Sequence, residues 1–572
     1  MDLPSSRPRN DDRYDDRNND RYDAVIVGGG IGGLVCAAYL AVAGRRVLVV
    51  EQHDVVGGSS QVFRRRRRYE FDVGVHYLGD CGPGGVLPTI LACLGAAGRI
   101  GFRPMDQDGF DRLLLPGLSM DVPVGWDRYL ANLQAALPSE AAALARCVGL
   151  LRTSAEELRR RLFGQVAAGA VRLPAAATRT LGELFADCGL STLAVTLLSA
   201  QLGNYGSPPS ATLVSTHVAM LDHYLQGAYY PQGGGQVLPA TLVEVIEAHG
   251  GTVRTRCRVE RIVVGEGRRV QGVLLAGGEQ VRSPIVVSNA DYRGTVLDLC
   301  GEQDFPASVQ ARTRAATSRA AVAVAYVALD RPLELLNANL WYWSGTDVEQ
   351  CYARCMSEPE SVAGRESGWR PPFAFLSFAS LKDPDNPAVC PPGHSNFQVM
   401  TLIPPTGDEP TAGYRRHPGY LADKSTLTEG LIRTAEQLIG PFRSSITHLE
   451  AATARTSRRY IGSSSGSPFG LADWGGTGRR PDVRTSIEGL YVTGCSTRHQ
   501  AGIAGTAISG IVAAGHILDR QLLPEAHRGA VLGDPGLLPE RGSDFDALRV
   551  SRGRQRRDAR GMAGLDVPQL TR

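Results

Sequence analysis

The sequence predicts an α/β protein whose parallel sheet is assembled from separated parts of the chain. A short apolar run at 24–27 leads directly into a glycine-rich turn and a helical stretch, and a second strand-like run follows at 47–50. Strand and glycine patterns return at 252–291 and again at 489–495. Short apolar runs separated by helices are typical of buried parallel strands.

The first glycine turn carries the fingerprint of a dinucleotide site. Gly28, Gly30 and Gly33 form GxGxxG between the strand at 24–27 and a helix predicted over 34–43. The first glycine permits a tight turn, the second lets the backbone approach a pyrophosphate, and the third lets the helix pack closely on the strand. The phosphates are expected at the helix N-terminus. A glycine turn without a nucleotide is the alternative, and the complete strand, helix and strand context disfavours it.

Two further features favour FAD over a nicotinamide cofactor. Glu51 ends the second strand about 20 residues after the first glycine, where an acid holds the ribose hydroxyls. Gly57 and Gly58 follow, and they resemble the extended ADP-binding motif of FAD-dependent oxidoreductases, which a simple nicotinamide dehydrogenase does not need. The neighbouring residues assigned to the same cofactor site are Ile31, Gly32, Gln52 and Ser59.

Size and charge restrict the class of protein. The 572 residues exceed one ordinary domain and predict two or three interleaved ones. The net charge of +3, from 61 basic and 58 acidic residues, is nearly balanced, so nucleic acid is not an expected partner. The chain offers no apolar run of about 20 residues that could span a membrane.

Cysteine usage predicts a reducing compartment. The 11 cysteines are odd in number and form no CxxC pair, which argues against a disulfide framework. Cys351 and Cys355 have no histidines at ligand spacing, so no metal site is predicted. The first residues are polar and lack the apolar segment of a secretory signal. We therefore expect a cytoplasmic protein.

The pattern of elements predicts a discontinuous nucleotide-binding domain that is interleaved with an α+β substrate domain. The predicted parts are a disordered tail at 1–22, FAD-binding parts at 23–80, 229–300 and 466–520, substrate-domain parts at 81–228 (mainly helical) and 301–465, and a flexible tail at 521–572.

The helical part contains two informative stretches. In residues 135–163, apolar residues recur at intervals of three and four positions, which predicts an amphipathic helix. Residues 188–220 carry no acidic or basic side chain apart from a histidine. Such a stretch indicates buried core helices or the wall of an apolar substrate tunnel, and the sequence leaves both interpretations open.

A run of five arginines, Arg64 to Arg68, precedes a stretch at 71–79 that alternates like a strand. The arginines fit the solvated tip of a hairpin. They also fit contact with phosphate or attraction to an anionic membrane surface, so peripheral membrane contact is a second hypothesis. Glycines within 71–79 would let a flat ring or the backbone approach closely.

Four separated blocks of the chain resemble one family of flavoenzymes. The blocks are VIVGGGIGGL with Glu51 and Gly57-Gly58, FDVGVHYLG, YYPQGGGQVLPATLVEVIEAHGG with its sequel VVSNAD, and GLYVTGCSTRHQAGIAGTAISG. By their order and spacing, residues 22–520 resemble the phytoene desaturase family, which includes carotenoid isomerases and retinol saturases. FDVGVHYLG is most similar to the retinol saturase version.

The resemblance implies an FAD domain of the Rossmann type, like that of amine oxidases, and a substrate domain over the flavin ring. It also implies a long, apolar, conjugated or conjugatable substrate. By position, the glycines of the first motif and Glu51 would hold the ADP part, and Val259 would present its backbone to the adenine. The residues expected to meet the pyrophosphate or the flavin edge are Gly494, Gly502, Ile503 and Ala504.

The sequence departs from the family pattern near its end. Cys495 stands where many relatives have another small or acidic residue, and Thr497 to Gln500 replace a Pro-Gly stretch common in desaturases. His76, Arg498 and His499 lie in the blocks expected to border the ring, and they are the candidate catalytic residues because histidine exchanges protons near neutral pH.

Each candidate also has a structural interpretation. His76 fits an ordinary hydrogen-bonded histidine, and Arg498 fits a partner of phosphate or of a flavin carbonyl. Lys382 and Asp383 fit a capped turn better than a chemical role. A redox function for the Cys495 thiol is the weakest of these hypotheses.

Three functions are compatible with these features. The first is hydride transfer to or from flavin N5 that desaturates or saturates a carbon–carbon bond of a long apolar polyene, such as a carotenoid, a retinoid or a polyketide-like chain. The second is flavin-dependent isomerisation or cyclisation of a polyene, as in similar proteins of bacterial polycyclic tetramate macrolactam biosynthesis. The third is flavin binding without catalysis. The sequence does not indicate an oligomeric state.

Overall fold

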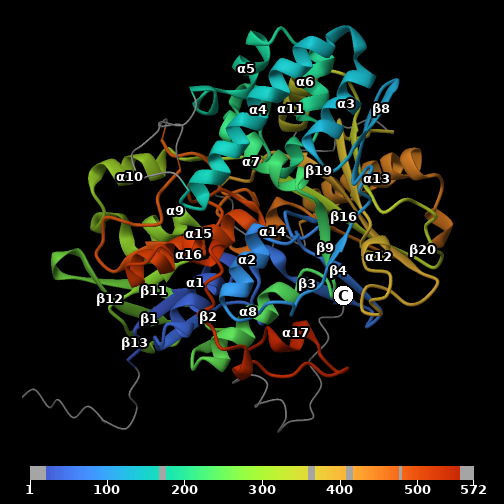
Figure 1. The fold of residues 1–572 in the computed structure, drawn as a ribbon. Coiled ribbons are helices and arrows are strands. Elements are labelled where there is room, and N and C mark those ends of the chain that lie inside the picture. The colour runs from blue at the N-terminus through green and yellow to red at the C-terminus, as the bar shows by residue number, and fades with distance from the viewer. Residues whose placement is uncertain (1–20, 166–174, 358–367, 408–416, 476–479, 554–572) are drawn as a thin grey trace, which may run out of the picture.

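The computed structural model describes residues 21–165, 175–357, 368–407, 417–475 and 480–553. Two regions stand out in Figure 1: a nucleotide-binding region around β1 and α1, and a second region in which a large sheet is covered by helices α3 to α7 and α11. Of the predicted disordered tail at 1–22, residues 1–20 lie outside the described part of the chain.

The nucleotide-binding region is built on a parallel sheet of five strands in the order β10-β2-β1-β14-β22. The strands are β1 Ala24–Val27, β2 Val47–Glu51, β10 Thr252–Thr255, β14 Val286–Ser288 and β22 Leu490–Val492. They come from three distant parts of the chain, which confirms the predicted discontinuous fold. The exact domain boundaries stay a prediction.

Three helices pack beside this sheet: α1 Ile31–Val42, α8 Val237–Ala248 and α15 Gly502–Leu518. Helix α1 is buried almost all round because it contacts both α8 and α15. A Cβ at Gly510 of α15 would lie 2.3 Å from the Gly32 carbonyl oxygen, so the close approach of these two helices requires a glycine. Helix α1 begins earlier than the sequence predicts, because Gly32 and Gly33 belong to its first turn.

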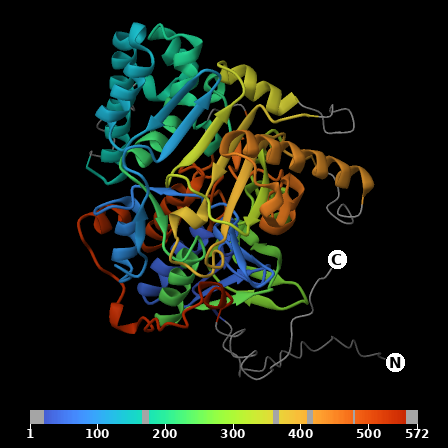
Figure 2. The ribbon, with the colours of Figure 1, turned by 90° about the vertical axis from the view of Figure 1, so that its right-hand side faces the viewer.

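The second region is built on a mixed sheet of seven strands in the order β20-β16-β19-β18-β17-β7-β8. The strands are β7 Asp111–Leu115, β8 Leu118–Val122, β16 Ala321–Leu329, β17 Asn339–Trp343, β18 Phe373–Ser377, β19 Ser395–Ile403 and β20 Ile446–Ala452. Alternate residues of β16 face opposite sides of the sheet. Ala323 and Ala325 pack under the long helix α13 Pro418–Ile439, the orange helix of Figure 2, whereas Val324 and Tyr326 face the helical layer.

The helical layer consists of α3 Trp126–Ala136, α4 Ala141–Leu162, α5 Leu181–Asp187, α6 Thr192–Ser199, α7 Val214–Leu225 and α11 Val348–Ser357. Helix α4 confirms the amphipathic helix predicted within 135–163, and its buried side includes Leu144, Val148 and Leu151. This layer, the large sheet and the hairpin described below share one hydrophobic core.

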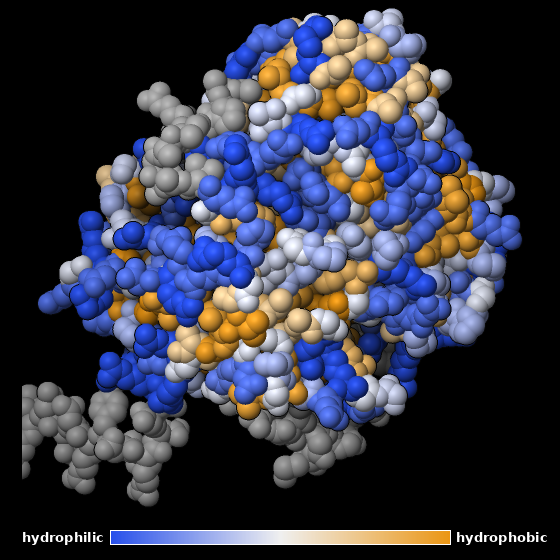
Figure 3. All heavy atoms as spheres, in the orientation of Figure 1, coloured by the Kyte–Doolittle hydropathy of each residue, from blue (hydrophilic) through white to orange (hydrophobic). Residues whose placement is uncertain are grey.

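The remaining elements are shorter or lie outside the two main sheets. They are β3 Val62–Arg65, β4 Tyr69–Asp72, β5 Leu78–Gly79, β6 Phe102–Pro104, β9 Ala228–Pro231, β11 Val259–Gly265, β12 Arg269–Leu275, β13 Gln280–Arg282, β15 Thr317–Ser318, β21 Leu471–Asp473, α2 Val86–Cys93, α9 Tyr292–Gly294, α10 Ala307–Arg314, α12 Ala379–Lys382, α14 Ala454–Ile461, α16 Leu522–His527 and α17 Ala547–Val550. Hydrophilic side chains cover most of the face in Figure 3, with hydrophobic patches between them, the mixture that is ordinary for a folded protein surface.

The strand predicted over 71–79 is wrong for most of its length. Only β4, which ends at Asp72, and β5 at Leu78–Gly79 are strands, and the chain between them is irregular. Gly74 explains the bend, because a Cβ there would lie 2.9 Å from the Ser59 carbonyl oxygen. His76 is consequently on a loop, where alternation of side chains no longer sets its direction.

The arginine run forms the tip of the β3–β4 hairpin, as predicted, but two of its members are paired within the protein. Arg66 and Arg67 have φ of 51° and 54°, and they are exposed with Arg68. Arg64 forms ion pairs of 2.8 Å with Glu70 and Asp546, and Arg65 forms one of 2.6 Å with Glu450. Only the three tip residues remain available to an external anion.

The prediction of a flexible tail at 521–572 is corrected for its first part. Helix α16 buries Leu522 and Leu523 in the hydrophobic core around α1, and α17 packs against α8. The Arg541 guanidinium forms a 2.8 Å ion pair with Glu244 of α8. Residues 554–572 lie outside the described part of the chain. The prediction failed because it relied on the Pro-, Gly- and Arg-rich composition of the segment, whereas a few apolar residues in it pack against helices of the nucleotide-binding region.

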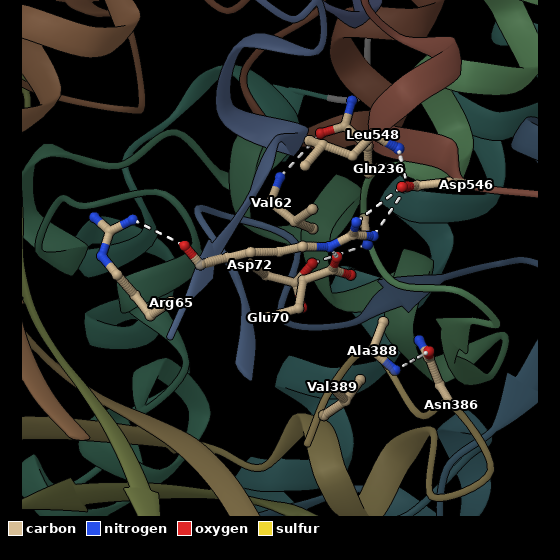
Figure 4. Close-up of polar contacts among 12 residues, drawn as sticks. Val62, Arg65, Glu70, Asp72, Gln236, Asn386, Ala388, Val389, Asp546 and Leu548 are labelled. Atoms are coloured by element: carbon tan, nitrogen blue, oxygen red, sulfur yellow. Dashed lines mark hydrogen bonds and ion pairs between the residues drawn. The ribbon is translucent and has the colours of Figure 1, made fainter. Parts of the chain in front are cut away.

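One buried glutamine joins this C-terminal segment to the cofactor motif. The Gln236 Oε1 accepts a 3.0 Å hydrogen bond from the Val62 N–H, and its Nε2 donates to the Val56 carbonyl at 2.9 Å and to Ser551 Oγ at 2.8 Å. Figure 4 shows Gln236 directed at Val62, close to the pair in which the Leu548 N–H donates to Asp546. These hydrogen bonds therefore link the loop before Gly57 to the C-terminal segment.

We predict that Gln236→Ala lowers the free energy of unfolding by about 2–4 kcal/mol, because it leaves two buried backbone groups and one buried hydroxyl without this partner. The midpoint of urea unfolding, followed by circular dichroism, measures the effect. Gln280→Ala is the matched control, since this exposed side chain should contribute less than about 0.5 kcal/mol. Equal midpoints for the two variants would contradict the proposed role of Gln236.

Candidate active site

A single large cavity joins the two regions of the protein. Its volume is about 1540 Å³. It begins at the carboxyl edge of strands β1 and β2, passes the start of α15, and ends between the large sheet and helices α4 and α7. Ligands of open parallel sheets bind at this edge, outside the carboxyl ends of the strands.

The nucleotide end of the cavity is formed by the β1–α1 turn. Gly28 has φ of 93°, which only glycine adopts without strain, and Gly30 caps α1 without any side-chain hydrogen bond. The N–H groups of Ile31 and Gly32, at the start of α1, are therefore available to an anion, whereas that of Gly33 donates to Asn289. The Glu51 carboxylate accepts 2.8 Å hydrogen bonds from the N–H groups of Gly29 and His53, and it retains lone pairs for ribose hydroxyls.

Asn289 holds this turn in place, and the sequence analysis did not identify it as a site residue. Its Oδ1 accepts 3.0 Å hydrogen bonds from the Gly33 N–H and from Thr493 Oγ1. A Cβ at Gly30 would lie 2.6 Å from its Nδ2, and one at Gly32 would lie 2.8 Å from its Oδ1. Its position directly after a strand predicted to be parallel was the signal that could have revealed it.

Two further backbone segments complete this end. Gly57 has φ of 133°, and its N–H donates a 2.7 Å hydrogen bond to the Gly29 carbonyl. Helix α15 also starts without a side-chain cap, and Gly502 there has φ of 84°. Two uncapped helix N-termini consequently face the same cavity, an arrangement suited to a ligand with a pyrophosphate and a second polar group.

The structure brings almost all predicted cofactor residues to this cavity. Those that line it are Gly28, Gly30, Ile31, Gly32, Glu51, Gln52, Gly57, Gly58, Ser59, Val259, Gly494, Gly502, Ile503 and Ala504. Gly33 is the exception, because it packs under the turn, where a Cβ would lie 2.6 Å from the Gly28 carbonyl oxygen. Its role is close packing of helix on strand, as the motif requires.

The three candidate catalytic residues also line the cavity, but their environments differ. Burial and the nearby Lys382 charge lower the pKa of His76 to about 3. Burial and the neighbouring Arg498 lower the pKa of His499 to about 4, and its Nε2 is buried without a partner. Both imidazoles are neutral at neutral pH. The Arg498 side chain is 56% exposed and forms a 2.8 Å ion pair with Asp482, which makes it the least suited of the three to chemistry.

Lys382 has a different place from the capped turn that the sequence indicated. It is 1% exposed, and its Nζ donates to the His76 carbonyl at 2.6 Å, to Asn339 Oδ1 at 2.5 Å and to Ser377 Oγ at 2.7 Å. Burial lowers the pKa of Lys382 to about 7. It lies behind the wall of the cavity and fixes the backbone of His76.

The other two weaker candidates also have structural surroundings. Asp383 accepts a 2.8 Å hydrogen bond from the Gly233 N–H. Burial raises the pKa of the Cys495 thiol, which argues against a reactive thiolate.

Aromatic side chains line much of the far part of the cavity. Tyr77 stacks on Tyr224 with ring centroids 4.1 Å apart, and Trp341 and Phe375 lie 4.3 Å apart. The residues at 188–220 contribute to both predicted environments: α6 is buried in the core, whereas 203–205, 215–216 and 218–220 line the cavity. The aromatic residues were missed because their spacing in sequence is indistinguishable from that of ordinary core residues.

Within the described ranges, no group of three or more His, Cys, Asp or Glu side chains has the arrangement of a metal site. The cavity instead offers backbone N–H groups, the Glu51 carboxylate at its nucleotide end and a long apolar wall.

Comparisons with known proteins agree with this geometry. The family model for flavin-containing amine oxidoreductases matches residues 31–518. An all-trans-retinol 13,14-reductase from Rattus norvegicus is 27% identical over 547 residues, covering 88% of this chain and 87% of that protein. A chloroplastic prolycopene isomerase from Arabidopsis thaliana is 26% identical over 539 residues, covering 90% of this chain and 86% of that protein. A solved oxidoreductase structure from Methanosarcina mazei aligns with a TM-score of 0.60 at 17% identity, covering 87% of this chain and all of that one.

The fold and the cavity define a dinucleotide-dependent flavoprotein. The chain belongs to the flavin-containing amine oxidoreductase family and is an FAD-dependent oxidoreductase. The predicted cofactor and the resemblance to retinol saturases and carotenoid isomerases are therefore confirmed.

The residues present also fit FAD on structural grounds. The Glu51 carboxylate can accept hydrogen bonds from the ribose, and two helix N-termini without a side-chain cap face the middle of the cavity. Apolar side chains line the part of the cavity beyond them, where the flat flavin ring would lie. The assignment of individual residues to parts of the cofactor remains a proposal.

We predict that Gly30→Val purifies without bound flavin, because its side chain meets Asn289 and fills the path of the pyrophosphate. Visible absorbance per mole of protein measures flavin content. Gly149→Val is the matched control, since a Cβ there has open space within 4 Å and the position lies in α4, away from the cavity. Full flavin content in the Gly30 variant would refute the proposed pyrophosphate site.

Proposed function

We propose that this enzyme transfers hydride between FAD and a carbon–carbon bond of a long apolar polyene, so that the bond is saturated or desaturated. The observation that carries the proposal is the continuity of the cavity from the nucleotide edge into a chamber walled by aromatic and aliphatic side chains. Relatives whose names specify a retinol reductase and a prolycopene isomerase support a substrate of this kind.

The cofactor and the chain divide the chemistry between them. Bound FAD supplies hydride donation or acceptance at its flavin ring. The chain holds the cofactor through the glycine turns and Glu51, and it orients the substrate along β16 and β19. In the sheet, Val322 lies opposite Leu402 and Val324 lies opposite Met400, and these four side chains form an apolar stripe along the cavity. The enclosed apolar wall excludes water from the reacting bond.

A proton must also move when a double bond is reduced or formed. His76 is the residue we propose for this step, since it lies in the cavity and its backbone is fixed by Lys382. Because its imidazole is neutral, it passes on a proton by accepting at one ring nitrogen as it releases from the other. His499 is the second candidate, and Arg498 is proposed only to orient a polar group.

Isomerisation of a polyene is the second candidate function, and the similarity to a prolycopene isomerase favours it. Isomerisation or redox-neutral cyclisation leaves the mass of the substrate unchanged, whereas saturation or desaturation changes it by two hydrogens. Mass spectrometry of small molecules that accumulate when the gene is deleted would identify the natural substrate and decide between these reactions.

We predict that the flavin-reduced holoenzyme converts all-trans-retinol to a product heavier by two hydrogens, measured by mass spectrometry under anaerobic conditions. Val324→Trp should abolish this conversion and retain flavin, because the larger side chain fills the apolar stripe. Leu336→Trp is the control, since Leu336 is 59% exposed on the surface. Conversion by the Val324 variant at the unaltered rate would exclude this path for the substrate.

Peripheral membrane contact is a separate proposal. No helix in the described ranges is both long and apolar enough to cross a bilayer. The exposed hairpin arginines 66–68, together with Leu421, Leu449 and Tyr460, which are 41–50% exposed, offer cationic and apolar groups to a lipid surface. We expect the protein, located in the cytoplasm, to float with vesicles that contain anionic lipid, and Arg66, Arg67 and Arg68→Gln to weaken this binding. Absence of flotation with the unaltered protein would contradict the proposal.

A further inference from the structure

Two buried arginines at one end of the cavity have no carboxylate partner among the described residues. Arg319 is 8% exposed and Arg480 is 9% exposed. The Arg319 Nη1 donates a 3.0 Å hydrogen bond to the Tyr205 carbonyl. The Arg480 guanidinium donates to the carbonyls of Phe469 and Cys495. All these acceptors are neutral.

The positive charge at this place is therefore uncompensated. The Nε groups of both arginines are buried without a hydrogen-bond partner. Burial lowers the pKa of Arg319, and burial together with the neighbouring Arg319 charge lowers the pKa of Arg480. Asp291 also lines the cavity, but its oxygens accept hydrogen bonds from the N–H groups of Gly294 and Ser464. Burying a charge without a partner costs free energy, and this cost is typical of groups that bind a ligand of opposite charge.

Arg319 belongs to the cavity, whereas Arg480 stands behind it. Arg319 lines the cavity with Tyr205 and Phe469, and Arg480 bridges the loops that carry Phe469 and Cys495. Gly206 has φ of 69°, and a Cβ there would lie 2.5 Å from the Phe469 ring, so a glycine is needed for this ring to lie beside Arg319 and Tyr205. The geometry makes Arg319 the contacting group and Arg480 the group that adds positive charge.

The position of Arg319 relative to the apolar stripe defines the shape of a ligand. Arg319 lies two residues before β16, whose residues Val322, Val324 and Tyr326 line the cavity in succession. At about 3.3 Å per residue, the distance along the chain from Arg319 to Tyr326 is roughly 20 Å. The cavity thus offers an elongated apolar wall with a cationic group at one end.

We propose that Arg319 binds a carboxylate or an equivalent single oxyanion at one end of the substrate, so that this enzyme binds an anionic polyene more tightly than a neutral hydrocarbon or alcohol. This inference rests on the proposed function, because it specifies the substrate class of the same cavity. Arg480 is a positioning residue, since it holds the loops around Arg319 and does not reach the ligand.

Binding of two matched probes tests the proposal without requiring turnover. All-trans-retinoic acid and all-trans-retinol share a chain and differ in the terminal group. Titration of the FAD-loaded enzyme, followed by quenching of protein fluorescence, measures both dissociation constants. We expect the acid to bind about 10- to 100-fold more tightly than the alcohol, the range given by a charge-assisted hydrogen bond.

Variants then locate the source of this preference. Arg319→Met should bind both probes with similar affinity, and Arg319→Lys should retain part of the preference because it keeps the charge. Arg65→Met is the matched control, since Arg65 lines the same cavity but is already paired with Glu450. The thermal midpoint of Arg319→Met should be unchanged or higher, because the substitution removes a buried unpaired charge.

Several outcomes would overturn the proposal. Equal affinity of the unaltered enzyme for acid and alcohol, or binding of neither, does so without any variant. Loss of flavin from Arg319→Met, with flavin retained in Arg65→Met, would assign the arginine to the cofactor instead. A strongly lowered thermal midpoint in both Arg319 variants would assign it to the fold. Turnover of retinol in the experiment above is independent of these measurements, so failure of one proposal is distinguishable from failure of the other.

Discussion

The hydrogen bonds of Asn289 are the interaction on which the cofactor end of the molecule depends. One side-chain oxygen accepts from the Gly33 N–H of α1 and from Thr493 beyond β22, and so joins three parts of the chain that are more than 200 residues apart. The glycines of the first motif leave room for this amide as well as for the cofactor. We therefore infer that glycines are required at these positions both for packing against Asn289 and for binding the cofactor.

The rest of the cavity follows from how the two sheets meet. Strand β16 divides its residues between two cores, so that small alanines face α13 and larger side chains face the cavity. The charges at the cavity are distributed unevenly. Arg65 is neutralised by Glu450, whereas Arg319 meets only a carbonyl oxygen. This contrast is the basis on which we propose that Arg319 orients a substrate at one end of the cavity.

Local signals predicted much of the fold and of the cofactor site. The helix Ala141–Leu162 agrees with the amphipathic stretch predicted within 135–163, because its apolar residues recur with one periodicity along a continuous run. The stretch at 71–79 failed because Gly74 allows the chain to bend where alternation suggests a strand. The C-terminal segment at 521–553 was missed because its few buried leucines dock on helices that are distant in sequence.

By itself the sequence determined the cofactor class, since the glycine motif and Glu51 form a local unit whose spacing is set by one strand, one turn and one helix. The tertiary structure alone decided which groups line the cavity. Arg319, Tyr205 and Phe469 come from three separate segments, and nothing in the local sequence around Arg319 indicates that it is buried without a counter-charge. Burial and pairing of charges depend on long-range packing, and local sequence patterns do not encode them.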